Sequence, residues 1–139
     1  MLPIINEKEH QKLVFPQEMD VWYVLPAIRR EFARALLAQG LSQKQVAPLL
    51  GVTEASVSHY KKEKRARELV FDEHTKFLIK NAAVRVVAQP QSIFGEIMAI
   101  DDELKRNGVF CQLHKSKSWT PGGCEQVCGQ HFFVGGLHG

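Results

Sequence analysis

Cysteine and histidine residues gather in the last part of the chain with spacings that suit metal binding. Cys111 precedes His114 by three residues, and after nine intervening residues Cys124 and Cys128 stand four residues apart. A Cys-x-x-His pair brings two ligands together across a turn, and a Cys-x-x-x-Cys pair does so on one face of a helix. The pattern predicts a tetrahedral site formed by Cys111, His114, Cys124 and Cys128, with His131 as an alternative ligand.

Two kinds of metal centre suit this set of ligands. Zinc commonly folds small segments that lack a core of their own. An iron–sulfur cluster held by three thiolates and one histidine, or by an exchangeable fourth ligand, changes its occupancy with oxygen or iron supply. Buried cysteines without any ligand are a third interpretation. A disulfide framework is disfavoured, because three cysteines are an odd number and residues 1–15 carry charges where a signal peptide needs an apolar run.

A second motif lies in residues 41–60, where two short helices are expected on either side of Gly51-Val52-Thr53. Ser42 can cap the first helix and Thr53 the second. The glycine can adopt the positive φ that a tight turn needs, and Ala47 is small enough for the helices to approach closely. Apolar residues at helical spacing face a shared core, namely Val46, Leu50, Val52 and Val57. This layout is typical of a helix-turn-helix.

The same segment resembles the DNA-binding helix-turn-helix of the Cro and lambda-repressor type, the XRE-like transcriptional regulators. Together with the upstream run VLPAIRRE it is similar to a group of prokaryotic regulators whose sequences continue into GLSQKEVAELLGVTEAAVSQY. The similarity covers residues 20–65, nearly half of the chain. One departure is Pro48, which forfeits a backbone hydrogen bond in the first helix. We expect it to shorten that helix and to leave the second unaffected.

The resemblance implies that the second helix lies in the major groove of double-stranded DNA. Side chains expected at base edges belong to the start and outer face of that helix, namely Thr53, Glu54, Ala55, Ser56, Ser58 and His59. Side chains expected at phosphates flank it, namely Gln43, Lys44, Lys61, Lys62, Lys64 and Arg65.

Charge is concentrated around this motif. Residues 29–67 hold nine Lys or Arg and three Glu, a net charge of +6, although the whole chain of 139 residues has a formal net charge of only +3. The flanking residues therefore sum to −3. A basic segment between slightly acidic flanks favours a polyanionic partner for that segment, most simply nucleic acid.

The rest of the chain supplies helices that position these motifs. Apolar residues at helical spacing predict one helix within residues 21–40, ended by Gly40, and another from Phe71 to Val86, ended by Pro90. A short strand at Val84–Val87 is the alternative for the end of the latter. A further helix over residues 92–105 carries an apolar stripe that forms either core or a dimer contact, namely Ile93, Ile97, Ile100 and Leu104.

These features predict an all-α protein, a five-helix helix-turn-helix domain with a short irregular C-terminal extension rich in Cys and His. The expected parts are an N-terminal arm (1–19), the DNA-binding core (20–67), a helical continuation that could serve dimerisation (68–108) and a metal- or cluster-binding tail (109–139). The length and the composition, 45% hydrophobic and 24% charged, suit one compact domain with a short appendage rather than a multidomain enzyme.

The function predicted from the sequence is a cytoplasmic, homodimeric transcriptional regulator whose DNA binding is tuned by a redox-responsive centre in the tail. We favour an iron–sulfur cluster over zinc, because so small a regulator needs an input and no other part of the chain offers a ligand pocket by sequence. A purely structural zinc and an antitoxin-type protein with an unknown partner are the alternatives. An enzyme with a cysteine nucleophile near His114 or His131 is disfavoured, since no phosphate loop or orienting third residue is evident. No stretch is long and apolar enough for a membrane helix.

Overall fold

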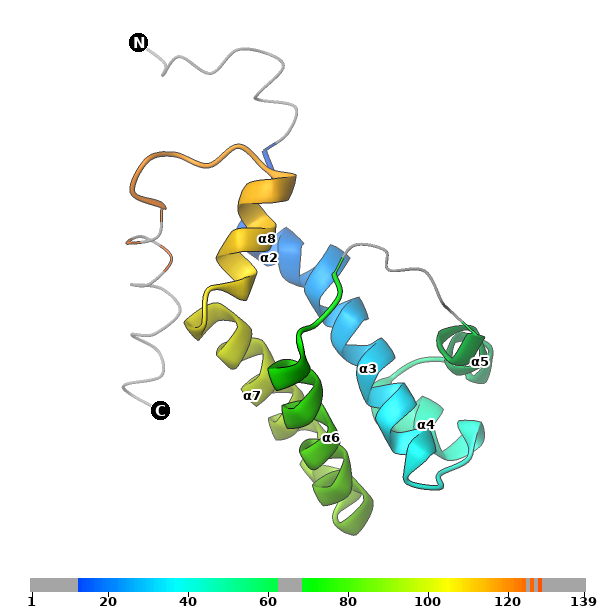
Figure 1. Cartoon of the computed structure of the whole chain (residues 1–139). Helices are drawn as coiled ribbons and strands as arrows, with labels where there is room; N and C mark the ends of the chain where they lie inside the picture. The colour runs from blue at the N-terminus through cyan, green and yellow to red at the C-terminus, as the bar shows by residue number, and fades with distance from the viewer. Residues whose placement is uncertain (1–12, 63–68, 125, 127, 129–139) are drawn as a thin grey trace. The chain divides into compact units, whose positions relative to one another are not determined.

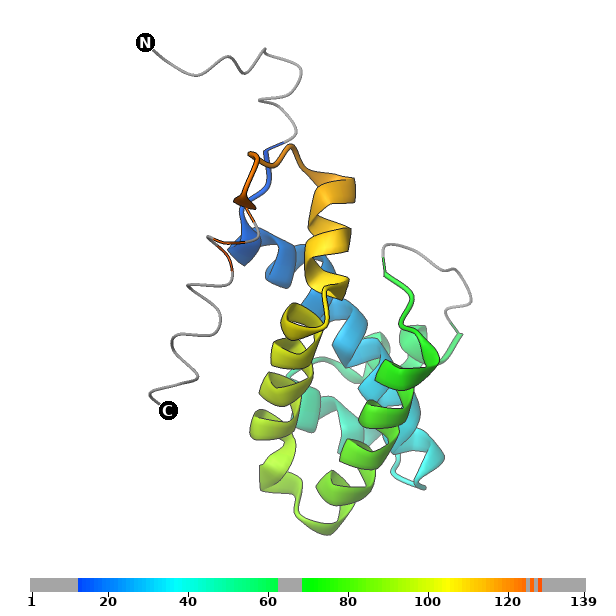
Figure 2. The same cartoon turned by 60° about the vertical axis from the view of Figure 1, so that its left-hand side comes forward.

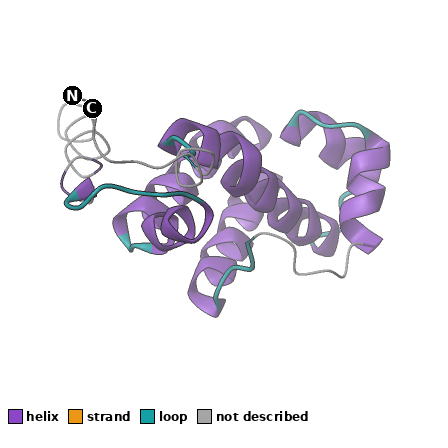
Figure 3. Cartoon of the chain, turned by 90° about the horizontal axis from the view of Figure 1, so that it is seen from above, coloured by secondary structure: helices purple, strands orange, loops and turns teal. Residues whose placement is uncertain are grey.

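The computed structural model describes residues 13–62, 69–124, 126 and 128, and these residues are helical with short connections (Figures 1 and 3). Within those ranges no residue is in a strand, so the prediction of an all-helical protein is confirmed. The alternative of a strand at Val84–Val87 is wrong, because these residues belong to the helix Glu73–Ala88. No described helix has the length and apolar character needed to cross a bilayer.

The chain divides into two compact units. One contains residues 22–101, with the helices α3 (Leu25–Ala38), α4 (Gln43–Leu50), α5 (Glu54–Lys62) and α6 (Glu73–Ala88), the 3₁₀ turn η2 (Pro90–Ser92) and most of α7 (Ile93–Arg106). The other joins the described residues before 22 to those from 102 onward, with α2 (Pro16–Met19) and α8 (Val109–Lys117). A π-helical turn, η1 (Asp20–Val24), precedes α3.

Helix α3 is the central element of the larger unit, where it contacts α4, α5 and α6 (Figure 2). Its residues Ile28, Phe32 and Leu36 follow each other at four-residue spacing and are fully buried. An apolar stripe at this spacing lies along one side of a helix, so burying it fixes which face meets the neighbouring helices. The helix predicted from apolar spacing within residues 21–40 therefore contributes these three residues to the core of this unit.

Helix ends in the larger unit carry the residues that their geometry requires. The Ser42 hydroxyl accepts a hydrogen bond from the Gln45 N–H at 3.1 Å, which makes it the predicted N-cap of α4. Gly40, after α3, has a φ of 102°, a region that glycine enters without steric cost. The Asp72 carboxylate accepts from the Thr75 N–H at 2.8 Å at the start of α6, and this bond lowers the pKa of the carboxyl group.

Pro48 does not end α4, contrary to the expectation of a shortened helix. The helix continues through it to Leu50. Proline removes the N–H that would bond to the carbonyl four residues earlier, but one lost bond in an eight-residue helix is compensated by packing when the helix buries an apolar face. Val46, Ala47 and Leu50 provide that face, and all three are buried.

Helices α6 and α7 are linked by an ion pair between Arg85 and Glu96. The guanidinium Nε and a terminal nitrogen donate to the two carboxylate oxygens at 2.5 and 2.9 Å. Hydrogen bonding to Arg85 lowers the pKa of Glu96 below its ordinary value of 4.5. More than half of the Arg85 side chain is exposed, so we expect a contribution of only about 0.2–1 kcal/mol to stability.

This pair predicts a specific pH dependence. Because the folded pKa of Glu96 is depressed, its contribution is complete above pH 4.5 and is lost as the pH falls through the lower folded pKa. The free energy of unfolding of Glu96→Gln, measured by urea denaturation, should therefore lie below that of the wild type at pH 7 and approach it at pH values below the depressed folded pKa. A difference that stays constant over this range would contradict the prediction.

The smaller unit also has more helix than the sequence predicted. An irregular segment was expected from residue 109, whereas Val109–Lys117 form α8. The physical reason is that Phe110 and His114, one turn apart, are both buried, with ring centroids 6.2 Å apart. The Lys105 ammonium pairs with the Asp20 carboxylate at 2.8 Å and lies 5.2 Å from the Phe110 ring centroid, which ties the N-terminal part of this unit to its C-terminal part.

Candidate nucleic-acid interface and cysteine pocket

Helices α4 and α5 are joined by a tight turn at Gly51, Val52 and Thr53. Gly51 has a φ of 67°, and the Val52 N–H donates to the Ala47 carbonyl at 3.0 Å, which closes the end of α4. Any other residue at position 51 would strain the backbone, since its Cβ disfavours positive φ. Val57 anchors α5 in the core with no exposed surface. The predicted turn is thus present. Of the four positions predicted to face a shared core, Val46, Leu50 and Val57 are buried, whereas Val52 is only half-buried.

Two of the predicted base-contacting hydroxyls are engaged within the protein. The Thr53 hydroxyl accepts a hydrogen bond from the Ser56 N–H and donates one to the Ser56 hydroxyl, both at 3.0 Å. These bonds satisfy the first turn of α5, as the predicted capping role of Thr53 requires. The side chains most suited to contact another molecule therefore lie further along α5.

Helical geometry separates α5 into two faces. Because Val57 points into the core, Ala55, His59 and Lys62 lie on the opposite face, and all three are exposed. Ser58 is half-buried beside them. Among the other predicted DNA-contacting residues, Lys44, Thr53, Glu54 and Lys61 are exposed and Gln43 and Ser56 are half-buried, whereas Lys64 and Arg65 lie outside the described residues.

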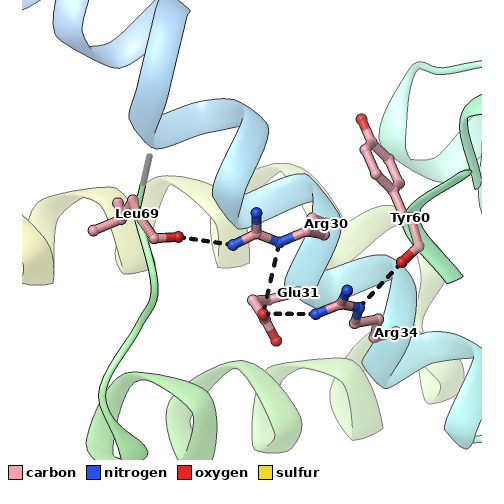
Figure 4. A network of polar contacts seen from close by, with 5 residues as sticks. All are labelled: Arg30, Glu31, Arg34, Tyr60 and Leu69. Atoms are coloured by element: carbon pink, nitrogen blue, oxygen red, sulfur yellow. Dashed lines mark hydrogen bonds and ion pairs between the residues drawn. The ribbon is translucent and has the colours of Figure 1, made fainter. Parts of the chain in front are cut away.

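Three arginines of α3 hold the ends of neighbouring segments by hydrogen bonds to backbone carbonyls. Arg29 Nε donates to the Leu50 carbonyl, in the last residue of α4, at 3.1 Å. Arg34 Nε donates to the Tyr60 carbonyl, in the last turn of α5, at 3.2 Å (Figure 4). The last carbonyls of a helix have no partner within it, and a cation there also favours the helix dipole.

Arg30 makes the third such bond. Its guanidinium donates to the Leu69 carbonyl at 2.8 Å, while Glu31 lies beside both Arg30 and Arg34 (Figure 4). Three of the nine positive charges counted between residues 29 and 67 therefore position the helices. The sequence pattern placed them in a basic surface and did not indicate this role. The sequence pattern indicated that these arginines lie off the apolar stripe of α3, but it did not indicate which backbone carbonyls they would contact.

This arrangement predicts a measurable cost for Arg29→Met. The variant keeps much of the aliphatic stem but leaves the Leu50 carbonyl without its charged donor. Loss of such a bond costs about 1–2 kcal/mol when the site is partly exposed to water, and urea denaturation measures it. Lys44→Met, an exposed position on α4, is the matched control, and an equal effect of both substitutions would exclude a special role for Arg29.

The predicted metal ligands lie in the smaller unit, and the structure brings only some of them together. His114, Cys124 and Cys128 line one pocket of about 360 Å³, whose remaining lining is almost entirely apolar. Cys111 lies on α8 and is not among the described lining residues, and His131 is outside the described part of the chain. None of the three cysteines is in a disulfide within the described structure.

These positions do not assemble the four-ligand centre expected from the sequence. Among the described residues no group of three or more His, Cys, Asp or Glu side chains is arranged to hold a metal ion. One ring nitrogen of His114 is also engaged, because its Nε2–H donates to the Val14 carbonyl at 2.5 Å. Zinc or an iron–sulfur cluster at these residues stays a prediction of the sequence.

Searches against protein-family models, curated proteins and solved structures found no match for this chain. The resemblance to XRE-like regulators is therefore carried by the residues of the motif alone and stays a prediction. The assignment of function depends on the geometry of α3, α4 and α5 and on the charges around them.

Proposed function

We propose that the protein is a sequence-specific regulator that binds double-stranded DNA through α4 and α5, acting as a helix-turn-helix. The observation that carries this proposal is the two-sided character of α5. Its inner face is anchored by Val57, and its outer face presents Ala55, His59 and Lys62 to solvent. A helix anchored on one side and polar on the other is what insertion into a major groove requires.

In this proposal two sets of residues in α4 and α5 have different tasks. Ala55 and His59, with Ser58 beside them, face base edges, where a methyl group can contact thymine and an imidazole can donate or accept a hydrogen bond. Lys44 and Lys62 face phosphates and fix the register without reading sequence. Thr53 and Ser56 act indirectly, because their mutual hydrogen bond orients the start of α5.

A homodimer is part of the same proposal, because helix-turn-helix proteins commonly match two half-sites about one DNA turn apart. The apolar stripe predicted on α7 can supply only part of a contact between two chains, because some of its residues are buried within one chain. Ile100 and Leu104 are buried within one chain, whereas Phe94 and Met98 on another side of α7 are exposed. Light scattering of the purified chain measures the oligomeric state.

The regulation predicted from the sequence requires its own test. An ultraviolet–visible spectrum with metal analysis, on protein purified without oxygen, distinguishes the two centres. Absorption between roughly 320 and 450 nm with iron and sulfide present would identify a cluster. Colourless protein with one zinc per chain would indicate a structural site, and protein without metal would leave the cysteines to other chemistry.

Selection from a random duplex library tests DNA binding while the operator sequence is still unknown. The full chain selects duplexes, and the selected and scrambled duplexes are then titrated by fluorescence anisotropy at several salt concentrations. We expect the selected duplex to bind at least about 10³-fold more tightly than the scrambled one, with log affinity falling linearly with log salt concentration. Equal affinity for both duplexes would contradict sequence-specific regulation.

A further inference from the structure

The cysteine pocket of the smaller unit is built by two segments that are about a hundred residues apart in sequence. One wall is formed by residues 13–16 and the other by His114 and residues 119–121, with Cys124 and Cys128 completing the lining. Val14 joins the walls, because its N–H donates to the Ser118 hydroxyl at 2.8 Å and its carbonyl accepts from His114. The pocket is thus framed by hydrogen bonds.

The size and lining of this pocket suit a small organic ligand. A volume of about 360 Å³ lies within the range of about 300–1,000 Å³ that is usual for ligand sites. An apolar cavity of about 150 Å³ is already sufficient to hold benzene. Phe15, Pro16, Trp119 and Pro121 supply apolar walls, and no Asp, Glu, Lys or Arg is among the described lining residues. An uncharged, mainly apolar molecule is therefore favoured over a polar or ionic one.

The two thiols of the pocket restrict the chemistry further. Cys124 and Cys128 have helical backbone conformation and lie one turn apart. Side chains at this spacing have Cβ atoms about 5–6 Å apart, whereas a disulfide needs about 3.5–4.5 Å. For two cysteines at this spacing with helical backbone conformation, a direct sulfur–sulfur bond would therefore require the backbone to change. A single atom bonded to both sulfurs spans a longer gap and does not require that change.

We propose that the pocket is a two-thiol receptor for a small organic arsenic(III) compound, whose arsenic bridges Cys124 and Cys128 while its apolar substituent lies among the aromatic and proline side chains. Arsenic(III) bonded to one carbon and two thiolates carries no net charge, which suits a pocket whose described lining residues include no Asp, Glu, Lys or Arg. This ligand needs two thiols, and Cys124 and Cys128 both line the pocket.

The bonding step is balanced without an oxidant or a reductant. In phenylarsine oxide the arsenic carries one phenyl group and one oxygen. Two arsenic–sulfur bonds form, the arsenic–oxygen double bond breaks, and the two thiol protons leave with the oxygen as one water molecule. Arsenic stays in oxidation state +III throughout. His114 keeps its hydrogen bond to Val14 and takes no part in the bonding.

Titration of the reduced full chain with phenylarsine oxide, followed by intact mass spectrometry, tests the proposal. We expect one adduct per chain that joins Cys124 to Cys128 and protects both from N-ethylmaleimide, while Cys111 stays as reactive as before. Cys124→Ser and Cys128→Ser should each weaken binding about 100-fold or more, because a second bond made within one molecule raises affinity by about 10²–10⁴. Cys111→Ser is the matched control and should bind as the wild type does.

A pocket-filling variant separates the apolar walls from the thiols. Thr120→Trp keeps both cysteines and should reduce the affinity at least 10-fold, with circular dichroism confirming that the variant is folded. Unchanged affinity in this variant, or an adduct that joins Cys111 to another cysteine, would overturn the proposal. So would protein that holds zinc or a cluster at Cys124 and excludes the probe. Adduct formation is measured without DNA, so its failure is distinct from a failure of the proposed DNA binding.

Discussion

Replacing Ala55 by glutamate is expected to weaken binding to the selected DNA duplex by about 100-fold or more, which corresponds to about 3 kcal/mol or more for an unpaired charge placed in an interface. The free energy of unfolding should change by less than about 0.5 kcal/mol, because surface substitutions away from caps and buried groups have little effect. Fluorescence anisotropy measures the first quantity and urea denaturation the second.

The separation of these two effects follows from the position of Ala55 on α5. Its side chain is exposed and lies opposite the buried Val57, so a longer side chain extends into solvent without disturbing the core. Glutamate is also a good helix former, and near the N-terminus of a helix its charge is favourable. In the proposed complex the same carboxylate would face base edges and phosphates, where it is repelled and stripped of water.

Ala99→Glu is the matched control for this variant. Ala99 is also an exposed alanine within a helix, α7, but it lies outside the α4–α5 motif. Its replacement adds the same charge to the chain, so any general effect of net charge on DNA affinity appears in both variants. Equal weakening by both substitutions would show that α5 has no special place in binding.

Helix positions could be predicted from the sequence because they depend on local patterns. Ile28, Phe32 and Leu36 recur at helical spacing, Ser42 provides a cap that needs only the next three residues, and Gly51 adopts the positive φ of the turn. Each of these features is decided within a few residues of its own position. The all-helical class followed from them for the same reason.

Features that depend on contacts between distant residues could not be predicted. Arg34 and the Tyr60 carbonyl are 26 residues apart, and His114 and the Val14 carbonyl are 100 residues apart. No periodicity indicates which backbone carbonyl a guanidinium or an imidazole will meet. From the sequence, the α3 arginines were therefore predicted to be surface charges. Residues 13–16 were predicted to belong to an N-terminal arm, whereas they form a wall of the cysteine pocket.

The metal site predicted from the cysteine spacing stays a prediction, although His114, Cys124 and Cys128 of its four residues line one pocket. Cys-x-x-x-Cys predicted two thiols on one helical face, and Cys124 and Cys128 do line the same pocket. The other half of the predicted site depended on Cys-x-x-His forming a turn, whereas Cys111 and His114 both lie within α8. The distance between two side chains at this spacing depends on whether the backbone between them is a helix or a turn. The spacing in the sequence does not show which of the two conformations forms.

Phe32→Ala is expected to reduce the free energy of unfolding by about 3–5 kcal/mol, the usual cost of truncating a fully buried phenylalanine. The Phe32 side chain has no exposed surface, and the alanine would leave a cavity at the middle of α3. Domains of this kind are stable by only about 5–15 kcal/mol. Urea denaturation followed by circular dichroism measures the change.

Phe77→Ala provides the control for this substitution. Phe77 lies on α6 in the same unit and is 59% exposed, so its truncation leaves no cavity and should change stability by less than about 0.5 kcal/mol. Similar destabilisation by both variants would contradict the assignment of α3 as the centre of the core.

The loss of Phe32 should also act on DNA binding, through the arginines of the same helix. Arg29 and Arg34 hold the ends of α4 and α5, and their own positions depend on how firmly α3 packs. A destabilised α3 therefore loosens the orientation of α5 before the whole unit unfolds. We expect Phe32→Ala to weaken DNA binding at about 37 °C more than at about 10 °C, because the fraction of molecules in which α3 has opened locally or unfolded completely grows with temperature over this range. Ala55→Glu changes the contact surface itself, so its relative loss of affinity should be nearly the same at both temperatures.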